Sequence, residues 1–354
     1  MRYALWTILT VSFYLSSAQD KNYFSVSYTP GFLLAHRADI KNLAAHNSGL
    51  EVSFEQERKH SEWGQHYAHP TIGFGLLYYN LGREETGHAI GAMSHVKLKL
   101  FDVGGTRLNF RMGAGLAYLT KKFDVYDNRR NQAIGSHLNG SMQFGLVGHN
   151  KLRQNRDYLE YGVSISHYSN AAFKVPNLGY NMPSFTLRYG FGVGAVSYAN
   201  VDTSVALSGM EYRVTAIYGK KQRNFAHPVD FYNYGLQFRG IRNVSRAKAW
   251  RFGIDYTLDK TYKFSENHLV ALDSISLIDK SEIAVAGGFQ WSFGRADILA
   301  EIGAYVYKPA VLKNALSQRM GLVYRINEHM SAQGTLRFHR GVADFFEMGL
   351  GYTL

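Results

Sequence analysis

The sequence predicts an all-β protein, a transmembrane antiparallel β-barrel of about 16 strands, with about 14 as the alternative count. Three observations predict this fold class: segments in which apolar and polar residues alternate, a composition rich in glycine and aromatic residues, and the lack of a long apolar run. The chain carries 35 glycines, 25 tyrosines and 22 phenylalanines but only 6 prolines. No segment reaches the roughly 18 to 20 apolar residues of a helical span, so a helical membrane protein is excluded.

The first residues have the pattern of an export signal. Residues 1–18 begin with the positive Arg2, continue with a short, mostly apolar stretch, and end with the small residues Ser16 and Ala18 before the expected cut. We therefore expect residues 19–354 to form the mature barrel. The chain has no cysteine, which excludes disulfides and thiolate metal sites and suits a protein that crosses an oxidising periplasm unfolded.

Strand-length segments alternate between apolar and polar side chains, as a lipid-facing barrel strand must. Segment 108–118 places its large apolar residues on one face, and Arg111 with small and polar residues on the other. The same division recurs in 232–239 and 283–293, and 346–354 alternates to the last residue. One face suits acyl chains and the other suits a wet lumen. Since a soluble sandwich also alternates, the pattern needs the export signal beside it.

The connections alternate in length, as a barrel with short periplasmic turns requires. If the first strand rises from the periplasm, the longer loops lie outside the cell. Connection 56–70 is longer than a periplasmic turn should be, and the sequence gives no reason for it. Residues 196–354 supply additional barrel strands, or alternatively a separate unit of about eight strands. Short turns are expected at 102–105, 294–297 and 327–329, and long loops at 120–134, 170–180 and 259–280.

The charge indicates the kind of partner. The formal net charge is +12, and a basic, aromatic surface suits either nucleic acid or anionic lipid. Export favours lipid phosphate, so we expect outer-membrane lipid and the barrel-assembly machinery as partners, and no nucleic acid. The scattered histidines lack the spacing of a metal site, so no metal is expected.

A histidine and a serine stand two residues apart at the end of the seventh expected strand, as His167 and Ser169. Because side chains alternate along a strand, both lie on one face, near enough for the imidazole to take a hydroxyl proton. They share the parity of the apolar side chains in 161–165, and Asn181 shares the outward parity of the next strand. An odd strand ends at the cell exterior. The pair is therefore predicted to face lipopolysaccharide in the outer leaflet.

The run His-Tyr-Ser-Asn-Ala at 167–171, with Pro176, Asn177 and Gly179 after it, resembles the outer-membrane lipid A deacylases of the PagL type, an acyloxyacyl-hydrolase-like family. The resemblance covers about residues 20–195. It implies a Gram-negative outer-membrane, multi-pass barrel. It also implies a carboxylic ester hydrolase that removes an ester-linked acyl chain from lipid A without a metal or organic cofactor.

By this resemblance Ser169 is the nucleophile and His167 is the general base. The short members of the family carry a glutamate as third triad residue where this chain has Asn181. A neutral amide can orient an imidazole but cannot stabilise its charge. The candidates for holding the oxyanion are Asn170, Asn177 and the backbone N–H groups of Ala171 and Ala172.

Two non-catalytic interpretations of these site residues stay open. A His-x-Ser pair at a strand end also occurs as an ordinary loop boundary, and Asn177 and Asn181 also suit a turn around Gly179. In that case the chain is a non-catalytic porin or structural barrel. An open lumen through about 16 strands would support this reading, because smaller barrels fill their interior with side chains.

Overall fold

The structure is a computed structural model that describes residues 21–59, 61–153, 156–194, 209–223, 229–263, 276–308 and 314–354. The expected signal peptide, 1–18, lies outside these residues. No helix of the described residues has the length and apolar character needed to cross a membrane.

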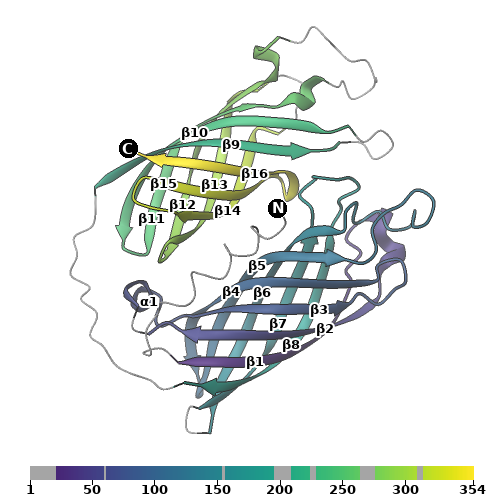
Figure 1. Ribbon diagram of the computed structural model, residues 1–354, viewed down its shortest axis with the longest axis vertical. Helices are drawn as coiled ribbons and strands as arrows, with labels where there is room; N and C mark the ends of the chain where they lie inside the picture. The colour runs from purple at the N-terminus through teal and green to yellow at the C-terminus, as the bar shows by residue number, and fades with distance from the viewer. Residues whose placement is uncertain are drawn as a thin grey trace, which may run out of the picture.

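The strands close into two antiparallel barrels, β1 to β8 and β9 to β16 (Figure 1). The predicted fold class and strand count are thus confirmed. Of the two arrangements left open for residues 196–354, the strand pairing gives the separate barrel, because β8 pairs with β1 and β16 pairs with β9. The first barrel contains β1 (Asn22–Phe32), β2 (His46–Glu57), β3 (Thr71–Asn80), β4 (His88–Val103), β5 (Thr106–Leu119), β6 (Leu138–Leu152), β7 (Asp157–Ser169) and β8 (Tyr180–Val193). The second contains β9 (Met210–Lys221), β10 (Phe231–Ser245), β11 (Lys248–Leu258), β12 (Ser281–Phe293), β13 (Ala296–Tyr307), β14 (Leu316–Arg325), β15 (Met330–His339) and β16 (Val342–Thr353).

The outer walls of both barrels are apolar, as the alternation predicts. On β5, Leu116 is 59% exposed while its neighbour Ala117 is buried. On β16, Leu350 is 61% exposed while Glu347 is buried in the lumen. A wall of this kind needs an apolar surrounding, because so much exposed hydrocarbon is unfavourable in water.

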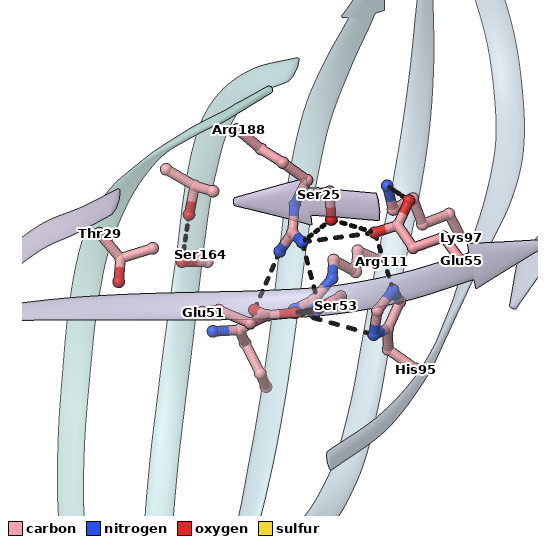
Figure 2. A network of polar contacts seen from close by, with 12 residues as sticks. Ser25, Thr29, Glu51, Ser53, Glu55, His95, Lys97, Arg111, Ser164 and Arg188 are labelled. Carbon is pink, nitrogen blue, oxygen red and sulfur yellow. Dashed lines mark hydrogen bonds and ion pairs between the residues drawn. The ribbon is translucent and has the colours of Figure 1, made fainter. Parts of the chain in front are cut away.

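Ion pairs fill the lumen of the first barrel (Figure 2). Glu51 binds Arg111 at 2.6 Å and Arg188 at 2.9 Å. Lys97 binds Glu55 at 2.7 Å and continues the network to β7. Buried charges persist only when they are paired and hydrogen-bonded, so these contacts hold the opposite walls together.

The second barrel repeats this interior with other residues. The carboxylate of Glu301 accepts hydrogen bonds from Arg239 at 3.0 Å, Arg251 at 2.8 Å and Arg319 at 3.1 Å. Arg319 also donates to Glu347 at 2.6 Å. Among the described residues, charged side chains thus occupy the space that a channel would need, which is the ordinary condition of a small barrel.

The two rims of the first barrel differ. The odd strands end at one rim, here called the long-loop rim, and the opposite rim is called the short-turn rim. An apolar plug closes the long-loop rim. The short helix η2 (Ala38–Leu43) and the connection 120–137 form it by folding inward over the strand ends. Its buried members include Leu33, Ile40, Leu43, Ile134, Tyr168 and Met182.

The long connection at the short-turn rim, 58–70, docks on the second barrel. It contains the helix α1 (Glu62–His66), which Figure 1 shows between the two barrels. Trp63 and Tyr67 are four residues apart and so lie on one side of the helix. Both contact Phe293, with ring centroids 5.6 and 4.6 Å away, and the Tyr67 hydroxyl donates to the Ala247 carbonyl at 2.7 Å. The connection is therefore long because it contains a segment that docks on the second barrel.

Candidate active site

His167 and Ser169 lie at the end of β7 on the outer wall, at the long-loop rim. Val163, on the same parity, is 60% exposed, whereas Ser166 and Tyr168, on the other parity, are buried in the lumen. Both site residues are half-buried. The outward direction expected from the alternation is therefore the one observed.

Asn181 lies directly opposite His167, because the register of β7 and β8 pairs the two residues. His167 Nδ1 is 2.7 Å from Asn181 Oδ1. An amide oxygen only accepts hydrogen bonds, so Nδ1 carries the proton and Nε2 keeps the lone pair that a general base needs. The hydroxyl of Ser169, two residues along the strand, makes no hydrogen bond to the imidazole within the described residues. Such bonds are often long before substrate binds.

His36, which the sequence analysis did not identify, completes this row of polar side chains. Its Nδ1 lies 3.1 Å from Asn181 Nδ2, so it accepts from the amide and fixes which way the amide points. The backbone of the same connection binds there too, because Leu34 N donates to Asn181 O at 2.8 Å. No local pattern could reveal His36, since it stands 145 residues from Asn181 in the sequence.

Gly179 is required beside the imidazole for two reasons. Its φ is +78°, a conformation that costs other residues about 1 kcal/mol or more. A Cβ at this position would also lie 2.7 Å from His167 Cε1. Its N–H donates to the Ala133 carbonyl at 2.9 Å, which ties the loop after β7 to connection 120–137.

The loop after Ser169 holds two non-glycine residues in the left-handed region. Ala171 has φ of +53° and Ala172 has φ of +60°. Such conformations are uncommon for residues with a Cβ and concentrate at functional sites. Within the described part of the chain, neither backbone N–H donates a hydrogen bond. Two free donors therefore lie next to the candidate nucleophile.

The other two oxyanion candidates serve the loop itself. Asn177 Oδ1 accepts from Asn170 N at 2.9 Å. Asn170 Oδ1 accepts from Lys174 N at 3.2 Å, and Asn170 Nδ2 donates to Ser136 Oγ at 2.8 Å. Both amide atoms of Asn170 thus make hydrogen bonds that hold the turn, and Ser136 is a further residue of the site that sequence reasoning missed.

Two family models match the chain, and each match lies within one of the two barrels. Residues 48–190 match the model described as lipid A 3-O-deacylase (PagL), and residues 210–354 match the model described as the C-terminal domain of acyloxyacyl hydrolase. No curated protein is similar enough to count as a match. A solved structure titled as the outer membrane enzyme PagL is 20% identical and covers 47% of this chain and 98% of its own, with a TM-score of 0.34. A Rhodopseudomonas blastica porin is 7% identical, covers 95% of this chain and 100% of its own, and has a TM-score of 0.18.

Proposed function

We propose that this chain, which belongs to the PagL-type lipid A deacylase and acyloxyacyl-hydrolase-like family, hydrolyses an ester-linked acyl chain of lipid A in lipopolysaccharide. One observation carries the proposal: an outward-facing imidazole, whose proton is held on Nδ1 by Asn181, stands two residues before an outward-facing serine. A porin has no use for this pair on its lipid face. An enzyme whose substrate is a membrane lipid needs it there.

The proposal includes a place in the outer membrane of a Gram-negative cell, with the strands crossing it many times and the barrel-assembly machinery inserting them. The apolar walls support a lipid surrounding. Exposed tyrosines near the long-loop rim, such as Tyr78 and Tyr118, suit the aromatic girdle of a membrane interface. With the long-loop rim at the cell exterior, the site lies beside the outer leaflet, where lipid A is found.

The proposed reaction proceeds in two steps. Ser169 Oγ attacks the ester carbonyl while His167 Nε2 takes its proton. The resulting oxyanion is held by the N–H groups of Ala171 and Ala172. It collapses to an acyl-enzyme as His167 gives its proton to the departing alkoxide oxygen of lipid A. Water, activated by the same imidazole, then releases the free fatty acid and restores Ser169.

The test is Ser169→Ala, expressed in a host that makes lipid A, with the lipid A masses compared by mass spectrometry. We expect wild-type protein to produce lipid A that lacks one acyl chain, and the variant to leave lipid A intact. Ser164→Ala is the matched control, because this serine lies on the same strand but bonds to Thr186 at 3.0 Å, away from the outer wall. Unchanged acyl loss in Ser169→Ala would overturn the proposal.

A further inference from the structure

The second barrel contacts the loop that follows the candidate nucleophile. At the end of β9, Gln222 N donates to the Ala172 carbonyl at 2.8 Å. Gln222 Oε1 accepts from Val175 N at 3.2 Å. Beside them, Lys220 Nζ lies 4.4 Å from the centre of the Phe173 ring. Three successive parts of the loop are therefore held by a strand end that belongs to the other barrel.

Gln222 is itself held in place. Its Nε2 donates to Asp230 Oδ1 at 2.8 Å, and Asp230 Oδ2 pairs with Lys220 Nζ at 2.7 Å. Burial alone would raise the pKa of the Asp230 carboxyl, but hydrogen bonds from Lys220 and Gln222 hold that pKa below its usual range. A side chain with both amide atoms engaged has little rotamer freedom left, so it is a fixed acceptor for the loop.

These contacts hold the chain directly after the strained residues Ala171 and Ala172. Gln222 binds both the carbonyl of Ala172 and the N–H of Val175. The first barrel holds the same turn through Asn170 and Asn177. With the Ala172 carbonyl fixed, rotation of the adjacent peptide is limited. The free N–H groups of Ala171 and Ala172 then keep one direction at little entropic cost during the reaction.

We propose that the C-terminal barrel is a positioning module for the active site of the N-terminal barrel, and that Gln222 is its positioning residue. This inference rests on the proposed function for the meaning of the loop, but it assigns a role to the second barrel that the first barrel's chemistry does not require. Gln222 touches no substrate. It acts through the backbone of Ala172 and Val175.

The test compares two full-length variants that each lose one side-chain contact between the barrels. Gln222→Ala removes the side-chain bonds to Val175 and Asp230 at the long-loop rim and keeps the backbone bond to the Ala172 carbonyl, so it tests the side chain alone. Tyr67→Phe removes the bond to the Ala247 carbonyl at the short-turn rim. With lipid A as substrate in detergent micelles, we expect Gln222→Ala to lower kcat about three- to tenfold without changing KM, as the loss of one hydrogen bond felt in the transition state would. We expect wild-type constants for Tyr67→Phe.

Hydrogen exchange of the peptide that covers 170–180 gives a second measurement, independent of activity. We expect faster exchange in Gln222→Ala and wild-type exchange in Tyr67→Phe. An unchanged kcat in Gln222→Ala overturns the inference, as does an equal loss in both variants, which would indicate simple docking of the barrels. If the wild-type protein does not deacylate lipid A, the proposed function fails instead. Exchange then decides alone: faster exchange in Gln222→Ala supports the positioning role of the second barrel, and unchanged exchange overturns it.

Discussion

Replacing Asn181 by alanine should slow deacylation while leaving the barrel folded. The amide makes two hydrogen bonds, to His167 Nδ1 at 2.7 Å and to His36 Nδ1 at 3.1 Å. Without the first bond, the imidazole can rotate or move its proton to Nε2, where it no longer serves as a base. Residues His36 and Asn181 touch no reacting atom, so the loss should appear in kcat.

The size of the effect follows from the bond that is lost. Truncation leaves a half-buried imidazole N–H without its acceptor, which costs about 1 to 2 kcal/mol. Because only the reactive orientation of His167 is affected, the same free energy adds to the activation barrier. The expected result is about a five- to thirtyfold fall in kcat.

Asn181→Asp should have the opposite effect on kcat, and the side chain keeps nearly the same size. A carboxylate would accept from His167 in the same place, and its charge would stabilise the imidazolium that forms in the transition state. A hydrogen bond to a charged group is worth about 1 kcal/mol more than a neutral one, so kcat should rise about fivefold. His36 tolerates this change, because its Nδ1 can donate in the other tautomer.

The assay measures initial rates of acyl release from lipid A by mass spectrometry, with folding checked by the heat-dependent gel mobility of the barrel. Asn80→Ala is the control, because this asparagine also lies at the long-loop rim, but among the described residues its side chain bonds only to Gly82 N at 3.0 Å, within its own turn. The expected order of rates is aspartate, asparagine, alanine. Equal rates for all three folded variants would refute the role given to Asn181.

Two further substitutions separate the outer wall from the lumen. Gly179→Ala should lower kcat about tenfold in a barrel that still folds, because the new Cβ displaces the His167 ring and the backbone is strained; a full rate of lipid A deacylation would contradict this. Arg188→Ala should destabilise the first barrel by about 3 to 5 kcal/mol in urea unfolding, because the buried carboxylates Glu51, Glu55 and Glu160 then share only Arg111 and Lys97, which leaves one buried negative charge uncompensated; a loss below about 1 kcal/mol would show that the network is not needed.

The strands, their turns and the outward direction of His167 and Ser169 could be predicted from the sequence. Each depends on neighbouring residues: the alternation of side chains gives the wall, and the turn at 102–105 joins β4 to β5 as expected. The parity of His167 with Val163 gave its direction for the same reason. Local geometry suffices for such features, because a strand has only two faces.

What the sequence left open depends on contacts between distant residues. Whether β8 closes on β1 or continues into β9 changes no side chain's parity, so one barrel and two barrels have the same pattern. For the same reason, the sequence alone could not identify His36 as part of the site or explain the length of connection 58–70. The bonds of Asn170 to Lys174 N and to Ser136 Oγ also depend on the folded loops and could not be predicted, while its expected role in holding the oxyanion stays a prediction.

Strand β7 carries both the stability and the proposed chemistry, on opposite faces. Glu160 points inward, where Lys97 binds it at 2.8 Å, while His167 and Ser169 point outward. A channel needs its lumen free, whereas an enzyme that works on its outer wall can fill the lumen with charges. Filling it makes the wall rigid, and rigidity is what a preorganised site on that wall requires. The charge-filled lumen and the outward-facing pair therefore both favour an enzyme over a pore.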